Sequence, residues 1–106
     1  MGLATFDQLE RADGVEYENV EAYGLDLRIG SLTTIALQQW EARKKESDFE
    51  RDSGLWLIVF SLVDKQGVRL PEGVHGKWVE ILRAKADKDN SNVIQAILEL
   101  NNLNEA

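Results

Sequence analysis

The stretch LWLIVFSLVDKQGVRLP, Leu55 to Pro71, joins a long apolar run to an abruptly polar turn. From Leu55 to Val63 the only polar side chain is that of Ser61. Periodicity cannot separate a buried strand from a buried helix in such a run. The β-branched and aromatic residues favour a strand, whereas Ser53 is a suitable helix N-cap and only one hairpin could supply sheet partners. We expect a helix, followed by a turn over Asp64–Gly67.

The residues before this run predict a β-hairpin over about 15–30. Its second half alternates with the period of 2 that is typical of a half-buried strand, in Leu25, Asp26, Leu27, Arg28 and Ile29. Val15 and Tyr17 alternate in the same way, but the phase slips at Asn19–Val20, and a β-bulge would explain the slip. Gly24 can adopt the positive φ of the tight turn between the halves.

Helical patterns flank the hairpin on both sides. Thr5 can cap two turns over Thr5–Ala12. Ser31 can cap an amphipathic helix that runs to about Lys45. The apolar face of that helix is formed by Leu32, Ala36, Leu37 and Trp40. The charged segment KKESDFERDSG that follows is expected to be an exposed link.

Two more helices are expected after Pro71, which suits a first helical turn. The apolar face of the first is formed by Val74, Trp78, Ile81 and Leu82. The second spans about Ser91 to Asn101, and Asp87 and Asp89 before it are interpreted as capping residues.

The end of the last helix has a clear signal. Asn102 can take the left-handed C′ position, and Leu103 would then fold back on Leu98. We therefore expect one α+β domain over 1–106: an acidic N-terminal hairpin region, 1–30, packed on a helical core, 31–106, that is a bundle of about four short helices.

The net charge of −7 is spread unevenly along the chain of 106 residues. Seven acidic side chains precede residue 28, against Arg11 alone, so this region has charge −6 and the remainder −1. Without a basic patch, nucleic-acid binding is not expected. The acidic region either keeps the protein soluble or meets a basic partner. A secretory signal is not expected, because the N-terminal residues lack a basic region followed by an apolar region. A membrane span is not expected either, because the apolar run is shorter than the roughly 20 residues that cross a bilayer.

The sequence offers little for chemistry, so we expect neither an enzyme nor a cofactor or metal site. His75 is the only histidine and there is no cysteine, and His75 stands in no nucleophile or metal motif. The carboxylates Asp48, Glu50 and Asp52 are interspersed with basic residues, which is typical of a solvated loop. Trp40, Trp56 and Trp78 lie in three different predicted helices and are interpreted first as core anchors.

The opening stretch resembles a segment of the tail assembly chaperones of long-tailed bacteriophages. In that family an apolar helix ends in SLVD, a short polar turn with a glycine follows, and a hydrophobic residue opens the next helix. Ser61–Asp64, Gly67 and Leu70 are similar to this pattern. The turn DKQG is more basic than the family's DE-x-G. The segment PEGVHG stands where members have acidic or serine capping residues. The resemblance therefore does not define where the fourth helix starts.

The flanking segments resemble the same family, so that the resemblance covers about residues 5–103. Leu27–Thr33 is similar to a V-x-V-R-G-L-T-like strand, and Trp40-Glu41 is similar to the W/F-E-x-x of the following helix. Leu100–Leu103 is similar to a closing L-N-G-L. Asparagine in place of that glycine still allows a left-handed cap.

The resemblance implies a phage or prophage tail assembly chaperone. Such a protein binds the tape measure protein and keeps it soluble for tail tube assembly. It acts in the host bacterial cytoplasm and is not expected in the mature virion. Many genomes also make a longer version of the chaperone by ribosomal frameshifting, and this longer version recruits the tail tube protein. This chain would be the short version.

Self-association is expected from the apolar run. A helix that is apolar on every face must be covered on all sides, and a domain of 106 residues has few elements to do so. We therefore expect a homo-oligomer with Leu55, Trp56 and Val59 near the contact. Trp40 and Trp78 are further candidates for partner binding, because tryptophan is enriched at binding hot spots.

Two other functions stay open. The chain could be a structural virion protein of the phage tail or neck. It could also be an acidic DNA mimic that inhibits a host enzyme, an idea motivated by the acidic N-terminal region. The nearly neutral remainder argues against a mimic, because mimics usually spread carboxylates over the whole surface.

Overall fold

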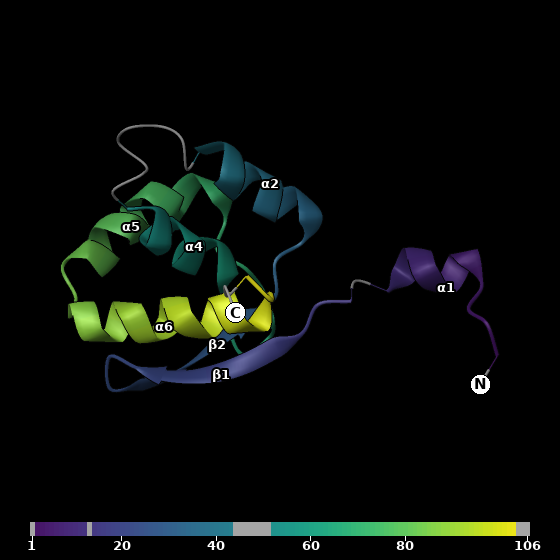
Figure 1. The fold of residues 1–106 in the computed structure, drawn as a ribbon, viewed down its shortest axis with the longest axis horizontal. Helices are drawn as coiled ribbons and strands as arrows, with labels where there is room; N and C mark the ends of the chain where they lie inside the picture. The colour runs from purple at the N-terminus through teal and green to yellow at the C-terminus, as the bar shows by residue number, and fades with distance from the viewer. Residues whose placement is uncertain (1, 13, 44–51, 104–106) are drawn as a thin grey trace.

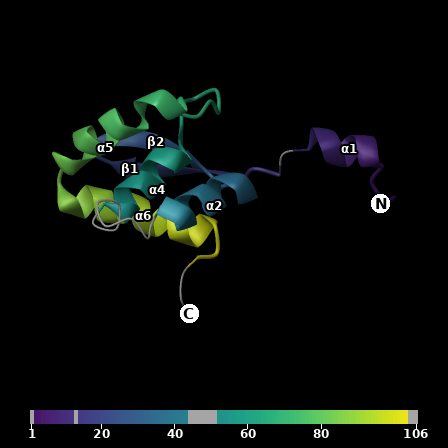
Figure 2. The same cartoon turned by 90° about the horizontal axis from the view of Figure 1, so that it is seen from above.

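The computed structural model describes residues 2–12, 14–43 and 52–103. Its elements, in chain order, are α1 (Phe6–Arg11), β1 (Tyr17–Ala22), β2 (Leu25–Gly30), α2 (Thr34–Arg43), α4 (Ser53–Ser61), β3 (Leu62–Val63), the 3-10 helix η1 (Glu72–Val74), α5 (His75–Arg83) and α6 (Asp87–Leu100). The strands form one antiparallel sheet in the order β1-β2-β3, and helices cover one of its faces (Figures 1 and 2). This confirms the α+β fold class, to which the structure adds a third strand.

The hairpin is regular, so the bulge expected at Asn19–Val20 is wrong. The strands pair without interruption from Tyr17 opposite Gly30 to Ala22 opposite Leu25. The phase slip in the sequence arises because Tyr17 faces away from the helices and is 48% exposed. The turn places Tyr23 at φ 58° and Gly24 at φ 73°, the two positive values of a type I′ turn. The prediction for Gly24 is confirmed.

The apolar run divides between helix and strand. The helix expected from Leu55 is present as α4, but it ends at Ser61, and Leu62 already has extended backbone angles of φ −62° and ψ 135°. Leu62 and Val63 then pair with Ile29 and Arg28 of β2. The last two residues of the run therefore form a strand, and the one available hairpin supplies their sheet partner.

Residues of the same chain cover α4 on all sides from Leu57 to its end. Leu57, Ile58, Val59, Phe60 and Ser61 are all buried. Helices α2, α5 and α6 pack against α4. The core is completed by residues from the other elements, namely Ala22, Ile29, Trp40, Val63, Val79, Leu82, Val93 and Ile97. An all-round apolar helix here does not by itself call for a second subunit, which corrects our reason for expecting an oligomer.

Of the two N-caps predicted on either side of the hairpin, Thr5 is confirmed and Ser31 is wrong. Thr5 caps α1, and its side chain and that of Gln8 form a reciprocal capping box. Ser31 does not cap α2; its Oγ accepts from the Glu16 N–H at 2.9 Å. Thr33 takes that role, because its Oγ1 accepts from the Ala36 N–H at 3.2 Å. The expected end of this helix at Lys45 lies outside the described residues.

The remaining caps differ from expectation by a few residues. Asp52, not Ser53, is the N-cap of α4, and its carboxylate pairs with Arg83. Pro71 precedes η1 instead of lying within a first α-helical turn. The last helix begins at Asp87, so Asp87 and its neighbour Asp89 lie in the first turn and are not caps.

The predicted end of the last helix is confirmed. Asn102 has φ 56°. The Leu103 N–H donates to the Leu98 carbonyl at 2.8 Å, and the Asn102 N–H donates to the Glu99 carbonyl at 3.2 Å. These two bonds define a Schellman motif.

Ser61 is the weak point of the buried helix. Its side chain is fully buried, and within the described part of the chain its Oγ has no hydrogen-bond partner. A buried unpaired hydroxyl costs about 1–3 kcal/mol. We therefore expect Ser61→Ala to raise the free energy of unfolding by about 1 kcal/mol, measured by urea denaturation. Ser53→Ala in the same helix is the control and should change it by less than about 0.5 kcal/mol. A destabilised Ser61→Ala protein would contradict this interpretation.

Candidate functional site

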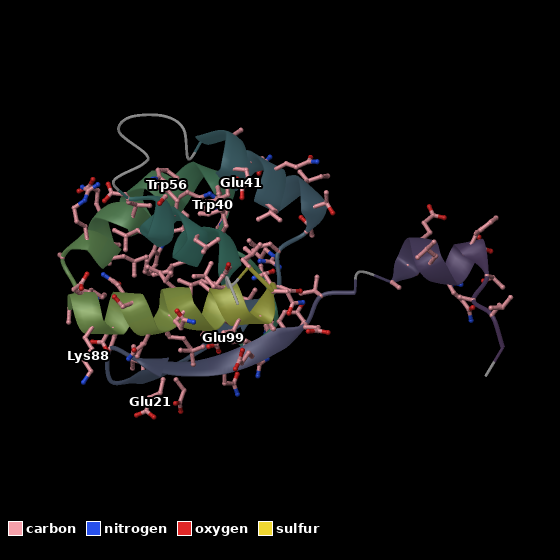
Figure 3. All side chains as sticks on the ribbon, in the orientation of Figure 1. Glu21, Trp40, Glu41, Trp56, Lys88 and Glu99 are labelled. Atoms are coloured by element: carbon pink, nitrogen blue, oxygen red, sulfur yellow. The ribbon has the colours of Figure 1, made fainter. Side chains whose placement is uncertain are left out.

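The five residues predicted to bind a partner do not form one surface. Val59 is 1% exposed and Trp40 is 7% exposed, so both belong to the core and neither offers a contact surface. Trp40 lies between α2 and α4 (Figure 3), and its Nε1–H donates to the Ser53 carbonyl at 2.8 Å. Leu55 is half-buried against the core. Trp56 and Trp78 are also half-buried, and they line two different grooves.

The more apolar of these grooves has a volume of about 540 Å³. We call it the Trp78 groove. It lies between the hairpin, the segment after β3 and α5. Its walls are formed by Tyr23, Leu25, Leu27, Leu62, Val63, Asp64, Val68, Arg69, Leu70, Pro71, Trp78, Leu82 and Lys85. Its volume falls within the range of about 300–1,000 Å³ that is usual for ligand pockets.

Two large apolar side chains of this groove lie in solvent. Leu25 is 61% exposed and Val68 is 59% exposed. They come from different elements, β2 and the loop after β3, and the fold brings them to one groove. Scattered exposed apolar residues are ordinary on a protein surface, whereas apolar residues gathered around a concave site mark an interaction surface.

The SLVDKQG turn builds one wall of the Trp78 groove. The Asp64 carboxylate accepts from the Gln66 N–H at 2.8 Å and from the Val68 N–H at 3.0 Å. Gly67 closes the turn at φ 81°, as expected from the sequence. The bonds to the Val68 and Gln66 N–H groups lower the pKa of Asp64, because they favour the charged carboxylate. The turn thereby fixes where Val68 enters the groove.

A hydrogen-bond chain fixes the opposite end of the groove. The Tyr23 hydroxyl donates to Asn90 Oδ1 at 2.5 Å, and Asn90 Nδ2 donates to the Leu82 carbonyl at 2.9 Å. The chain joins the hairpin turn to α6 and α5. Lys85 Nζ lies 5.8 Å from the centre of the Tyr23 ring, a cation–π distance. An ammonium group therefore stands at this end of the groove.

The pKa of Tyr23 is raised from 10.0, first by burial and then by the charge of Asp89. Native Tyr23 thus keeps its proton at a pH where the unfolded chain loses it, and stability falls as pH rises from about 10. We expect Tyr23→Phe, which removes the hydrogen bond to Asn90, to lower the free energy of unfolding at neutral pH by about 1 kcal/mol. Between about pH 8 and pH 11 the free energy of unfolding should then fall less in this variant than in the wild type.

Urea denaturation at both pH values measures this difference. An equal alkaline loss in the two proteins would show that Tyr23 is not the group responsible.

The second groove, the Trp56 groove, has a volume of about 600 Å³ and a more polar wall. It lies between α2, α4 and the start of α5, and its residues are Gln39, Ala42, Trp56, Phe60, Leu70, Glu72, His75 and Gly76. Leu70 contributes to both grooves and separates them. His75 is half-buried here. Its ring packs edge-on against Phe60 at 5.2 Å, and its Nε2 lies 3.1 Å from the Leu70 carbonyl, an arrangement that suits a structural histidine.

The outer face of the hairpin is polar. Glu21 points away from the helices (Figure 3) and stands directly opposite Asp26 in the strand pairing. Arg28 Nε donates to Asn19 Oδ1 at 3.3 Å on the same face. Like charges directly opposite each other in a sheet destabilise it slightly. This face is thus acidic at the turn end, and the apolar Trp78 groove lies on the other side of the same strands.

Other kinds of site are not found in the part of the chain that the structure describes. Those residues contain no group of three or more histidine, cysteine, aspartate or glutamate side chains placed to hold a metal ion. None of the described helices combines the length and apolar character needed to cross a membrane. Comparison with protein-family models, with curated proteins and with solved structures finds no match. The apolar Trp78 groove is the candidate functional site.

Proposed function

We propose that the chain is a phage tail assembly chaperone and that it holds an apolar helical segment of the tape measure protein in the Trp78 groove. The observation that carries this proposal is the combination of a groove of about 540 Å³ with solvent-exposed apolar residues at its rim. Amphipathic helices bind in such grooves by inserting side chains from one face, spaced three or four residues apart. The resemblance in the sequence supports the identity of the client.

The chemistry of the groove fits a client that must be kept from aggregating. Leu25 and Val68 offer apolar contact, while Trp78 gives the half-buried aromatic surface that is common at binding hot spots. A single groove of this size covers only a short part of a helix. A long client would therefore bind several copies, and linked sites of moderate affinity hold a partner well together.

The surface away from the groove suits this role. The hairpin turn region carries Glu21 and Asp26 on its outer face, and the net charge of the chain is −7. Copies that coat an apolar client would present these acidic faces to solvent, and a net charge far from zero opposes precipitation.

Co-expression with the tape measure protein of the same genome tests the proposal. We expect more of that protein to remain soluble in the presence of this chain, and the two to co-purify. If the tape measure protein precipitates equally with and without the chain, and none is retained, the chaperone function is wrong. Finding the chain in purified virions would favour a structural protein of the tail or neck instead.

A further inference from the structure

Helix α1 projects from the body with its apolar side chains in solvent. Figures 1 and 2 both place it away from all other labelled elements. Leu3 is 100% exposed, Phe6 is 90% exposed and Leu9 is 67% exposed. Phe6 and Leu9 are three residues apart and lie on the same side of the helix. A capping box nevertheless gives α1 a defined start at Thr5, so the segment is a formed helix with an unpartnered apolar side.

The Trp78 groove is the complementary surface on the same molecule. Its lining is mostly apolar, and Leu25 and Val68 at its rim are 61% and 59% exposed, somewhat less than Phe6 and Leu9 of α1. Lys85 stands at one end of the groove, and α1 carries Asp7 and Glu10. The other acidic group of the groove, Asp64, is occupied by the backbone N–H groups of its own turn. Charge and apolar character thus match between the helix and the groove.

The connection between α1 and the sheet favours a groove on another molecule. Glu16 is fixed in line with β1 by two bonds to Ser31: its carbonyl accepts from the Ser31 N–H at 2.8 Å, and its N–H donates to Ser31 Oγ at 2.9 Å. The chain therefore leaves the body along the strand direction. The groove extends from Val68 and Arg69 to Tyr23 and Leu25 at the turn end of the hairpin. Figure 1 shows α1 beyond the other end of the hairpin, away from the groove of its own molecule.

We propose that α1 of one molecule docks in the Trp78 groove of a second copy of the chain. Phe6 and Leu9 enter the groove between Leu25 and Val68, with the acidic side of α1 toward Lys85. Exchange in both directions closes a symmetric pair. This contact differs from the one expected at Leu55, Trp56 and Val59. It concerns the chain alone, and it fills the groove proposed for the tape measure protein, so α1 and the client would compete for this one site.

Sedimentation velocity of the complete chain tests the contact from both sides. Phe6→Ser removes the apolar side chain of α1, and Val68→Ser changes the groove. Both positions are exposed in one molecule, so neither variant should disturb the fold, which circular dichroism checks. We expect the wild type to self-associate, and each variant to weaken association at least about tenfold, equivalent to about 1.4 kcal/mol. Ile35→Ser, at a 69% exposed position of α2 outside the groove, should behave as the wild type.

Mixing the two variants gives the sharpest result. The Val68→Ser protein keeps an intact α1 and the Phe6→Ser protein keeps an intact groove, so the mixture should form a mixed dimer that neither variant forms alone. A wild type that stays monomeric at high concentration overturns the proposal. This holds also if α1 docks in the groove of its own molecule, because the proposal requires a second copy. An oligomer that both variants leave unchanged also overturns it.

This test fails separately from that of the proposed function. Phe6→Ser changes α1 only, so it should abolish self-association while retention of the tape measure protein persists. A Phe6→Ser protein that no longer self-associates, and so has a free groove, but still retains none of the tape measure protein would leave the docking of α1 intact and remove the chaperone function.

Discussion

Replacing Ile58 by alanine is expected to lower the free energy of unfolding by about 3 kcal/mol, within the 2–5 kcal/mol range for isoleucine to alanine in a core. Ile58 is fully buried in α4, the helix against which α5, α6 and α2 pack. The substitution removes apolar contact and leaves a cavity that the surrounding helices cannot fill. A small domain has only about 5–15 kcal/mol in total, so the variant should be close to unfolding at 37 °C.

Ile35→Ala is the matched control for this substitution. It removes the same atoms from a helical isoleucine, but Ile35 is 69% exposed on α2. Surface substitutions of this kind usually change stability by less than about 0.5 kcal/mol. Urea denaturation of both variants and the wild type measures the difference. Equal, small effects in the two variants would mean that α4 is not the buried centre of the fold.

The second large effect is expected at Arg69. Its Nη1 donates to the Phe60 carbonyl at 2.8 Å, near the C-terminal end of α4, and its Nη2 donates to the Ser31 carbonyl, 2.5 Å away, beyond β2. One side chain thus satisfies two carbonyls of different elements at partly buried positions. Hydrogen bonds to charged groups contribute about 1.5–3 kcal/mol, so Arg69→Ala should lower stability by about 3 kcal/mol.

Two further variants separate this role of Arg69 from a general effect of charge. Arg69→Lys keeps the charge but cannot donate to both carbonyls with the planar guanidinium geometry, so we expect it to recover less than half of the loss. Arg28→Ala removes an arginine from β2 whose bonds, to Asn19 Oδ1 at 3.3 Å and the Lys65 carbonyl at 3.2 Å, lie at exposed positions. Its loss should be below about 1 kcal/mol. Equal losses of stability in Arg69→Ala and Arg28→Ala would contradict the proposed role of Arg69 in joining α4 to the end of β2.

Local signals in the sequence were sufficient for most of the elements. The alternation in Leu25–Ile29 identified β2, Gly24 located the turn, and Asn102 with Leu103 located the end of α6. Each of these depends on interactions within a few residues, which a sequence pattern records directly. The α+β class followed from them.

The change from helix to strand at Leu62 could not be predicted in this way. Nothing in the apolar run distinguishes Leu62 from the preceding residues; it becomes extended because β2 offers an open edge, and that pairing is tertiary. The early start of α6 has a similar cause. Asn90 appears as a polar residue before the apolar stripe, yet it is 6% exposed and bonds to Tyr23 and Leu82.

The candidate site was predicted only in part. Trp78 was singled out because tryptophan is common at interfaces, and it does line the apolar groove. Leu25 and Val68 were not singled out, although both are large apolar residues next to turns. Their exposure depends on how the hairpin and the SLVDKQG loop meet α5, which the sequence pattern does not contain. Val59 was misjudged for the same reason, because other elements of the chain cover it.

The most direct test of the central claim compares two charge substitutions in the co-expression experiment with the tape measure protein. Val68→Lys places an ammonium in the Trp78 groove, at a position that is 59% exposed, whereas Ile35→Lys places one on α2, at a position that is 69% exposed. We predict that Val68→Lys retains at most about a tenth of the tape measure protein that the wild type retains, equivalent to about 1.4 kcal/mol, while Ile35→Lys retains as much as the wild type. Undiminished retention by a folded Val68→Lys protein would contradict the assignment of this groove as the binding site.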